Sequence, residues 1–482
     1  MKKNLQTMVT AVLLGASTTA FAQSGNITFA DEEVKKICVK NFDTDADGEL
    51  SYDEAAAVTD LKSFFYGNTS ITKFNELVHF KGLAELSSAP AGYGSFKGTF
   101  QGCTALQEIT LPEELTSIGG SAFSSTAITS ITIPGNVTSI GADVFYGCWA
   151  LAAVEVRGNV AKIDQNTFRD CRALINIALP ESVTEIGNCA FFGCSSLNEI
   201  VLPSGLTKVG TNAFNSCIRL TTITIPENCK AFGFNSFAKC EQLKEVIVLT
   251  KEYARDLVNA FGVVDGRKTY FEHHVFGDYK TKTMPTRIPR FGEMLPCVKP
   301  AYEYTTFACD ADVDFGGVSG LKAYVASHES GSNKVNLTEV TAVPAKTGLV
   351  IKATAGEVYK LALAAGAVAP SANLLKGVVA NATVMAVDGE NTNLILKDGA
   401  FLKLAADGVL AAGKAYLSVP TAELPVGAKA FDIVWDNTTG INTVESTQTK
   451  MENDAWYTLG GQRIAKPAKG GIYIHNGKKV IF

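Results

Sequence analysis

Histidine and tryptophan are scarce in this chain of 482 residues, which contains five His and three Trp. Few side chains can therefore serve as general bases, and no G-x-S-x-G, H-E-x-x-H, P-loop or G-x-G-x-x-G signature occurs. Basic residues do not outnumber acidic ones, since 43 Lys and Arg stand against 48 Asp and Glu, a net charge of −5. Nucleic-acid-binding proteins usually carry a basic surplus. We therefore expect neither an enzyme nor a nucleic-acid-binding protein.

Long apolar runs are also missing after the first 22 residues, so no transmembrane span is expected. The N-terminus begins Met-Lys-Lys, continues with a mostly apolar stretch from Met8 to Leu14 and reaches Ala-Phe-Ala at residues 20–22. A basic start, a short apolar segment and small residues at a cleavage point are typical of a secretory signal peptide. We predict that residues 1–22 are such a signal and that the protein is exported, either secreted or held at the cell surface.

An acidic loop of twelve residues, from Asp43 to Glu54, follows a segment with helical apolar spacing. It fits D-x-[DN]-x-[DN]-G-x5-E, a pattern that arranges oxygen ligands around a hard cation such as calcium. Gly48 permits the sharp turn at the sixth position, and position 7 contributes its backbone carbonyl. The predicted metal ligands are Asp43, Asp45, Asp47, Glu49, Ser51 and Glu54.

This loop resembles the calcium loops of EF-hand and dockerin modules, and one copy lies within residues 23–70. The resemblance implies calcium as the bound ion in a small helix-loop-helix segment. Ser51-x-x-Glu54 is also a capping box, which predicts a helix from Asp53 to Leu61. The alternative is therefore an acidic turn in front of a capped helix, with no metal function.

Seven phenylalanines recur every 22 or 23 residues: Phe100, Phe123, Phe145, Phe168, Phe191, Phe214 and Phe237. Around them the pattern F-x-x-C-x-x-L-x-x-I-x-[LI]-P returns, as in residues 191–203. A fixed period of this length with regular Leu and Ile positions is the signature of leucine-rich repeats. One such unit cannot bury its own apolar face, whereas stacked units form a solenoid with one continuous core.

The repeats resemble the BspA-like leucine-rich repeats of bacterial surface proteins, from Ile71 to Val248. The resemblance implies a mainly β fold and a role in adhesion or partner binding. We expect the solenoid to occupy residues 71–261 and to end in a short capping helix from Glu252 to Phe261. One rung is a residue shorter and has Thr126 in place of Cys, where we expect a local kink.

Partner binding is expected on the outward strand positions, because packing fixes the inward ones. Over seven rungs these positions form a rigid row about 30 Å long, which suits a protein surface better than a small molecule. The row carries four Glu, which predicts a basic patch on the partner. The predicted partner-binding residues are Glu108, Thr110, Ser130, Thr132, Glu155, Asn176, Glu199, Val201, Thr222, Thr224 and Glu245.

The chain has eleven cysteines, six of which share one repeat position: Cys103, Cys148, Cys171, Cys194, Cys217 and Cys240. Side chains in a ladder point the same way, so neighbouring Cβ vectors do not face each other as a disulfide needs. We expect these six to be buried, reduced and slow to react. By their separation, Cys297 and Cys309 are the best candidates for a disulfide.

The remaining sequence divides into four segments after the solenoid. Proline-rich residues 262–300 are expected to form an irregular connection, and residues 301–436 show the short alternating strands of a β-sandwich-like domain. Residues 437–454 are polar and predict a linker. Residues 455–482 contain an Asn-Gly hairpin signal and resemble the end of the C-terminal sorting domains of type IX secretion. A terminal hairpin packed on the β-rich domain is the alternative.

These features favour an exported or cell-surface repeat protein that binds an extracellular protein, such as a host matrix or cell-surface protein. One calcium-stabilised loop would precede the repeats. Two alternatives remain: a structural protein of the cell envelope, and a glycan-binding accessory protein that acts through the β-rich domain.

Overall fold

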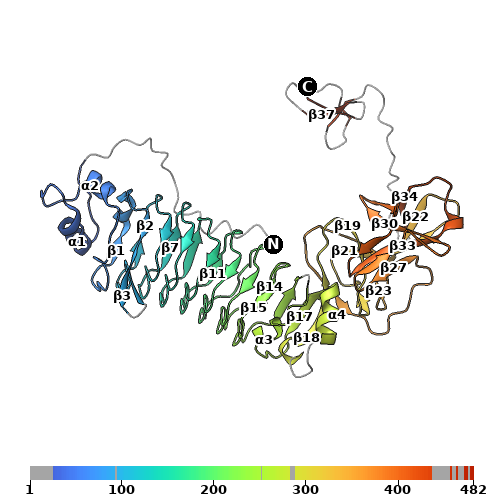
Figure 1. Cartoon of the computed structure of the whole chain (residues 1–482), viewed down its shortest axis with the longest axis horizontal. Helices are drawn as coiled ribbons and strands as arrows, with labels where there is room; N and C mark the ends of the chain where they lie inside the picture. Colours follow the sequence, from blue (N-terminus) through green and yellow to red (C-terminus); the bar gives the residue numbers. More distant parts are fainter. Residues whose placement is uncertain are drawn as a thin grey trace.

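A computed structural model describes residues 25–92, 95–250, 252–282 and 288–436, together with the short strands 456–458, 463–464, 472–475 and 478–481. The predicted signal peptide and the predicted linker 437–454 lie outside the described residues. Figure 1 shows two short helices at one end of a long, gently curved row of rungs, and a β-rich domain at the other end.

The helices are α1 (Glu32–Phe42) and α2 (Tyr52–Ala57), so the second helix ends earlier than Leu61, where the sequence predicted its end. Asp31 caps α1 by accepting hydrogen bonds from the backbone N–H groups of Glu33 and Val34. The other oxygen of the same carboxylate accepts from the backbone N–H and the hydroxyl of Thr72, at 2.7 and 2.8 Å. One side chain therefore joins the helical segment to the first rung of the array.

Two ladders of short parallel strands run along the array, and together they enclose its core. The main ladder consists of β1 (Lys73–Phe74), β5 (Glu108–Ile109), β7 (Ser130–Ile133), β9 (Ala153–Val156), β11 (Asn176–Ala178), β14 (Thr222–Ile225), β16 (Glu245–Val248), β17 (Lys268–Glu272) and β18 (Glu293–Val298). The second ladder consists of β2 (Glu85–Leu86), β6 (Ser117–Ile118), β8 (Ser139–Ile140), β10 (Lys162–Ile163), β12 (Glu185–Ile186), β13 (Lys208–Val209) and β15 (Ala231–Phe232). The short helix η1 (Asn75–His79) and the hairpin of β3 (Ser88–Gly92) and β4 (Ser95–Gly98) lie at the first rungs.

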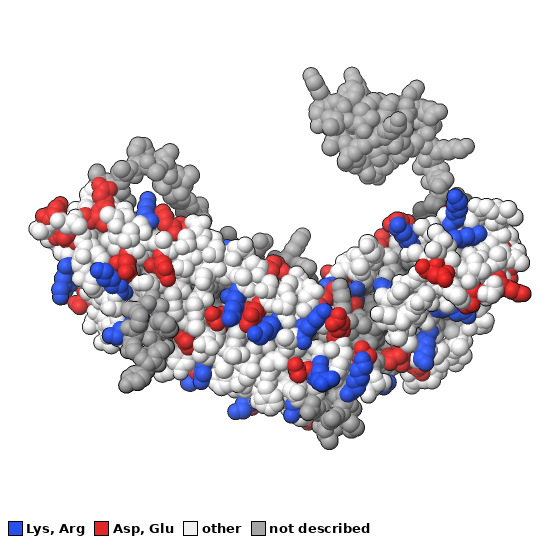
Figure 2. All heavy atoms as spheres, viewed as in Figure 1, with Lys and Arg blue, Asp and Glu red and all other residues white. Residues whose placement is uncertain are grey.

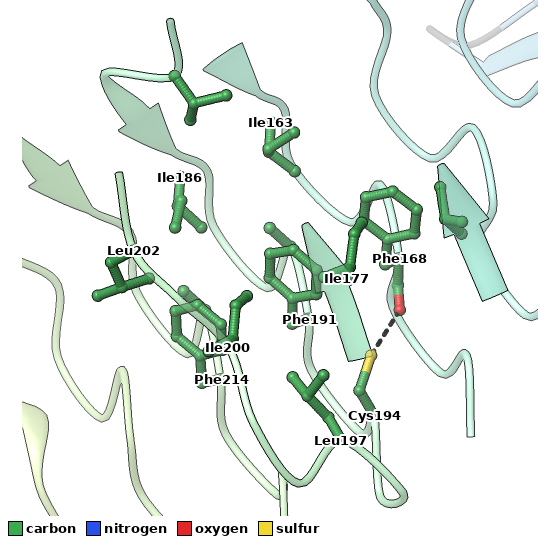
Figure 3. Packing of buried hydrophobic residues seen from close by; sticks show 14 of the residues in the cluster. Ile163, Phe168, Ile177, Ile186, Phe191, Cys194, Leu197, Ile200, Leu202 and Phe214 are labelled. Carbon is green, nitrogen blue, oxygen red and sulfur yellow. Dashed lines mark hydrogen bonds between the residues drawn. The ribbon is translucent and has the colours of Figure 1, made fainter. Parts of the chain in front are cut away.

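The repeated phenylalanines form a stack through the middle of the array (Figure 3). From Phe100 to Phe261, neighbouring rings are 5.0–5.6 Å apart between centroids and within 13° of parallel. Register is exact from rung to rung: for example, Ile131 pairs with Val154, and Val154 with Ile177. The rings of Phe123 and Phe145 are 5.6 Å apart and 7° from parallel, so the shorter rung with Thr126 keeps its place in the stack. The local kink expected there stays a prediction.

The array is longer than the sequence predicted. Residues 262–300, expected to be an irregular connection, contain β17 and β18, which continue the main ladder in parallel from β16. Helix α4 (His273–Lys282) and the turn η2 (Ile288–Arg290) stand between these two strands. The predicted capping helix 252–261 is reduced to α3 (Leu257–Ala260). The repeat motif is not recognisable after residue 248 because the β17 rung keeps a stacked Phe at 261 but has Val264 and Arg267 where the motif has Cys and Leu.

The β-rich domain is built on one ten-stranded sheet, mostly antiparallel, with a parallel pairing between β22 and β34. Its strands are β19 (Tyr304–Phe307), β21 (Leu321–His328), β22 (Lys334–Val340), β24 (Leu349–Ala353), β27 (Leu375–Val378), β29 (Val387–Asp388), β30 (Asn391–Lys397), β31 (Ala400–Lys403), β33 (Lys414–Pro420) and β34 (Ala430–Asp436). Smaller sheets contain β20 (Val313–Asp314), β23 (Ala342–Val343) and β26 (Ala362–Leu363), and β28 (Ala382–Val384) with β32 (Gly408–Leu410); η3 (Thr421–Glu423) is a single turn. One core, which includes Phe401, Leu417 and Phe431, lies on one face of the large sheet.

Strand β25 (Tyr359–Lys360) connects the two regions, because it pairs antiparallel with β18 at the end of the main ladder. The C-terminal strands β35 (Trp456–Thr458), β36 (Arg463–Ile464), β37 (Ile472–His475) and β38 (Lys478–Ile481) form a four-stranded antiparallel sheet, with β37 and β38 paired as the predicted hairpin. Among the described residues, no helix has the length and apolar character needed to cross a membrane.

Candidate binding face and candidate calcium loop

The predicted partner-binding residues lie on the outer side of the main ladder, which we call the main face. Pairing brings them into columns: Asn176 is opposite Ala153, and Ala178 is opposite Glu155 on one side and bridges to Val201 on the other. Eight of the eleven side chains are exposed: Glu108, Thr110, Ser130, Glu155, Asn176, Glu199, Val201 and Thr222. Thr132, Thr224 and Glu245 are half-buried. The continuation of the second column at Ile247 is buried, in a small cluster with Leu249 and Cys297.

The charge on the main face differs from the sequence-based expectation. Glu108 forms an ion pair with Lys73 at 3.2 Å, and Glu245 pairs with Lys360 from the β-rich domain. Glu155 accepts two hydrogen bonds from the guanidinium of Arg157, at 3.1 and 3.0 Å, and these bonds lower the pKa of the Glu155 carboxyl. Figure 2 shows acidic and basic side chains interspersed along the array.

Of the four predicted glutamates, Glu199 is the one for which the described part of the chain provides no ion pair. The two rows of outward positions predicted from the sequence did not include these cations. Arg157 lies two residues beyond Glu155, and Lys360 is 115 residues from Glu245. The uniformly acidic row that the sequence suggested is therefore largely neutralised.

Sequence reasoning also missed the second ladder as a surface. Ile-Gly or Val-Gly segments form four of its strands, β6, β8, β12 and β13, and exposed or half-buried positions of the ladder include an alternating charge series. Glu185 lies 3.8 Å from Lys162 and 3.0 Å from Lys208, and these residues pair in register between neighbouring strands. The recurring T-x-[IV]-G segments carried the signal, because the polar and apolar alternation of a strand is present in each copy.

The ladder cysteines are structural rather than functional. All six are buried, and each thiol donates to the carbonyl of the Phe about one rung earlier, as Cys194 does to Phe168 at 3.1 Å (Figure 3). Thr126 fills the same position, but its hydroxyl donates to the carbonyl of Phe123 in its own rung, at 2.9 Å, and that carbonyl also accepts from the thiol of Cys148. Burial raises the pKa of Cys148 to about 11 and of Cys240 to about 12.

The disulfide suggested between Cys297 and Cys309 is wrong. Both thiols are buried and free, and all eleven cysteines, each of which lies among the described residues, are unpaired. That suggestion rested on the short separation of the two residues along the chain. Cys297 belongs to the last rung and Cys309 to the β-rich domain, so closeness in sequence does not pair their sulfur atoms.

The predicted calcium loop is a compact turn between α1 and α2. One carboxylate oxygen from each of Asp43, Asp45 and Asp47 lies within 4.8 Å of the other two. The turn depends on left-handed backbone at Ala46 (φ 62°) and Gly48 (φ 88°), whose N–H groups donate to the carboxylate of Asp43 at 2.7 and 2.9 Å. These three carboxylates are the donor set that a hard divalent cation prefers.

The other predicted ligands are placed differently. Glu49 directs its side chain to Lys35 at 2.7 Å, which leaves its backbone carbonyl as the ligand that the pattern requires. Ser51 and Glu54 form the predicted capping box of α2. Hydrogen bonds from the backbone N–H groups of Ser51 and Thr44 lower the pKa of Glu54 to about 2, so this carboxylate is ionised at neutral pH. The residues present therefore fit a cation, with Glu54 shared between capping and ligation.

Within the part of the chain that the structure describes, no second loop lies opposite this one. Ile27 donates its backbone N–H to the carbonyl of Leu50 at 2.8 Å, and Asn26 bridges to Ser51, so the start of the described chain takes the place of a partner loop. Leu50 is fully buried, in the same continuous core as Ile71 and Phe74 of the first rung. The loop is consequently part of the cap of the array.

Comparison with known families supports the prediction of leucine-rich repeats. The family model described as BspA type leucine rich repeat region matches in six copies, over residues 96–177 and 161–256. No curated protein matches the chain.

Among solved structures, a leucine-rich repeat protein from Bacteroides ovatus is 22% identical, with a TM-score of 0.31, over 46% of this chain and 67% of that one. A leucine rich cell surface protein from Faecalibacterium prausnitzii is 24% identical, with a TM-score of 0.28, over 45% and 65%. A leucine-rich repeat protein from T. pallidum is 27% identical, with a TM-score of 0.21, over 29% and 57%. The chain thus matches about two thirds or less of the length of these proteins. Residues 96–256 of this mainly β protein match the model of the BspA-type leucine-rich repeat region.

Proposed function

We propose that the protein is an exported, surface-exposed binder that holds an extracellular protein on its main face, in the manner of an adhesin. The observation that supports this most is the row of exposed side chains from Glu108 to Thr222, above a fully buried core and with parallel register in its central strands β7, β9 and β11. Parallel pairing holds these side chains about 4.8 Å apart from rung to rung, so the row is preorganised for a partner with its own extended surface.

We expect binding of the partner to depend less on charge than it would if the glutamates of the row were unpaired. Glu155 and Glu108 already have basic neighbours, while Glu199 and the exposed Val201 lie together in the central rungs without an ion pair among the described residues. We expect the contact to be centred there, with an apolar contribution and a single acidic side chain that favours a basic group on the partner.

This proposal can be tested by kinetics of the full-length protein on immobilised host matrix proteins. Glu199→Lys should lower the association rate, and the wild-type rate should fall as salt is raised. Glu114→Lys is the matched control, because Glu114 is exposed on the array but outside the main face. Equal effects of the two variants, or no binding to any extracellular protein, would count against the main face.

We also propose that the acidic loop binds calcium and thereby stabilises the N-terminal end of the array. Bound calcium would offset the mutual repulsion of the Asp43, Asp45 and Asp47 carboxylates. The support is the donor set described above and the shared core of Leu50 with the first rung. The loop's own hydrogen bonds hold the ligand oxygens in place, and the bound ion would stabilise the cap.

Calorimetry with calcium on the full-length protein tests the loop. We expect a dissociation constant of about 10⁻⁴ to 10⁻³ M or tighter, as in other extracellular modules. Glu54→Gln should weaken binding sharply, whereas Asp53→Asn, an exposed acid at a non-ligand position of the same loop, should not. Absence of calcium heat from a folded protein would leave only the capped helix as the loop's role.

For the C-terminal strands β35 to β38, we propose a role as a sorting signal, supported by their antiparallel hairpin. Deleting residues 455–482 should leave the protein inside the cell envelope without reducing its stability. Normal export of the truncated protein would favour a purely structural hairpin.

A further inference from the structure

Aromatic and arginine side chains gather on the turns that lead from the second ladder to the main ladder in the middle of the array. Packing fixes the Phe, Cys and Leu positions of these turns, while the positions between them differ from rung to rung. In three consecutive rungs the free positions hold the residues that we call the turn cluster: Tyr146, Trp149, Arg169, Arg172 and Phe192. Trp149 is 66% exposed, so the core of the array does not account for it.

The turn cluster is held together by contacts between neighbouring rungs. The guanidinium of Arg169 lies between two rings, 5.6 Å from the ring centroid of Tyr146 and 5.0 Å from that of Phe192. The guanidinium of Arg172 lies 5.6 Å from the ring centroid of Trp149. These cation–π contacts restrain the arginines before any partner arrives, which lowers the entropic cost of binding.

The charge of the turn cluster is positive. Asp170 lies between the two arginines, with carboxylate oxygens 3.6 Å from Nε of Arg169 and 3.9 Å from Nη2 of Arg172. One carboxylate therefore faces two guanidinium groups. The side chain of Arg172 is 62% exposed, so a carboxylate of a partner can reach its N–H donors.

One face of the Trp149 indole is left open by the neighbouring rung. Arg172 belongs to the rung that follows and covers one face of the ring. The rung that precedes is the short one, which has a residue fewer and only Ala127 in this turn. The preceding rung therefore contributes no large side chain to the indole, in agreement with its exposure. An open indole face suits a flat apolar ring of a partner.

A further cation continues the same row of turns. Arg219 is exposed two rungs beyond Arg172, and the described part of the chain provides no ion pair for it. The stacked rings of these rungs are 5.2 and 5.1 Å apart, so the backbone positions of the two arginines are separated by about 10 Å. In a polyproline II helix, residues three positions apart lie on one side and about 9 Å apart. Carboxylates at every third residue of such a segment match this spacing.

We propose that the turn cluster binds an acidic, proline-rich segment of an extracellular protein in the polyproline II conformation. A proline ring packs on the open face of Trp149, and carboxylates three residues apart pair with Arg172 and Arg219. Aromatic side chains are the surfaces on which proteins dock such segments, and Trp, Tyr and Arg carry most of the energy of protein interfaces. The site is separate from the main face and adds to the function proposed above.

The test is titration of the full-length protein with four probes. One peptide contains four Glu-Pro-Pro repeats, a second four Lys-Pro-Pro repeats and a third four Glu-Gly-Gly repeats, and the fourth probe is a heparin hexasaccharide. We expect the Glu-Pro-Pro peptide to bind with a dissociation constant of about 1 mM or tighter, and more weakly as salt is raised. The Lys-Pro-Pro peptide should not bind. The flexible Glu-Gly-Gly peptide should bind about tenfold more weakly, because it lacks the rings and the preformed conformation.

Three variants locate the site. Trp149→Ala should weaken binding of the Glu-Pro-Pro peptide by about tenfold or more, and thermal unfolding should show that this exposed position leaves the fold intact. Arg172→Gln and Arg219→Gln should each weaken binding about fivefold and reduce its salt dependence. Tyr66→Ala is the matched control, because Tyr66 is an exposed ring under a cation, Lys97 at 5.0 Å, at the N-terminal end of the array.

Binding of the Glu-Pro-Pro peptide that Trp149→Ala and Arg172→Gln weaken and Tyr66→Ala does not would support the proposal. Equal binding of the Glu and Lys peptides, binding that the turn-cluster variants leave unchanged, or no peptide binding at about 10 mM would overturn it. Binding of the heparin hexasaccharide alone would overturn it in favour of an anionic glycan. The main face does not depend on this site, so either can fail without the other.

Discussion

In the repeat array, each strand pairs with the strand one repeat away, as Ile163 does with Ile186, whereas in the β-rich domain Lys334 of β22 pairs with Asp432 of β34. The array repeats one packing arrangement, in which each rung buries the same Phe, Leu and Ile positions against its neighbours. The β-rich domain closes one core, with Phe401 and Phe431, through strands far apart in the sequence, while residues such as Leu349 belong to the core that continues from the array.

This difference predicts that a destabilising substitution in the array unfolds only the rungs near it. Phe191→Ala removes a ring stacked at 5.2 Å on Phe168 and 5.1 Å on Phe214, and should cost about 3–5 kcal/mol. In a solenoid the loss should be confined to neighbouring rungs. Hydrogen exchange read by mass spectrometry should show lost amide protection around residues 168–237 and unchanged protection in the β-rich domain.

The comparison variant is Phe401→Ala, whose side chain is fully buried in the core of the β-rich domain. It should reduce protection across the whole large sheet and leave rungs 100–237 protected. If Phe191→Ala unfolds the β-rich domain to the same extent as the array, the two regions are one cooperative unit and the comparison does not hold.

A second prediction concerns the glycines of the second ladder. A Cβ at Gly210 would lie 2.5 Å from the backbone carbon of Gly187 in the preceding rung, so Gly210→Ala should cost about 1–3 kcal/mol. Gly135→Ala is the control, because nothing lies within 4 Å of its Cβ position. Denaturant unfolding measures both. A cost at Gly135 equal to that at Gly210 would mean that close rung stacking is not what selects glycine.

Much of the array was accessible from sequence because its contacts repeat. The Phe and Cys positions, the inward Ile and Leu positions and the outward columns are fixed by one period, and they are confirmed by the burial of residues such as Phe191, Cys194 and Ile200. The rungs after residue 248 were missed because they keep strand pairing without the motif. The turn cluster around Trp149 could not have been found, because its residues stand at positions that the repeat leaves free and meet only through the stacking of rungs.

A third prediction uses the thiols of the array. Burial raises the pKa of Cys148 to about 11, against 9.0 for an unperturbed thiol, so above pH 9 the unfolded chain releases a proton that the folded chain retains. Stability should therefore be constant up to about pH 9 and fall as the pH rises from there to about 11.

The variant Cys148→Thr separates this effect from other titrating groups, because it copies the residue that already stands at Thr126. Its loss of stability between pH 9 and 11 should be shallower than that of the wild type. At pH 8 a thiol reagent should reach the half-buried Cys189 first and the six ladder thiols only after unfolding. Rapid labelling of Cys171 or Cys194 in the native protein would contradict their burial.

The most direct test of the main face compares two substitutions in the same rung. Val201 is exposed on the main face and Thr207 is exposed next to the second ladder, six positions later in the chain. Association of full-length Val201→Arg and Thr207→Arg with the extracellular protein that the wild type binds should be measured side by side. The account predicts a loss of about tenfold or more for Val201→Arg and less than about twofold for Thr207→Arg. A larger loss for Thr207→Arg, or binding that neither variant changes, would contradict it.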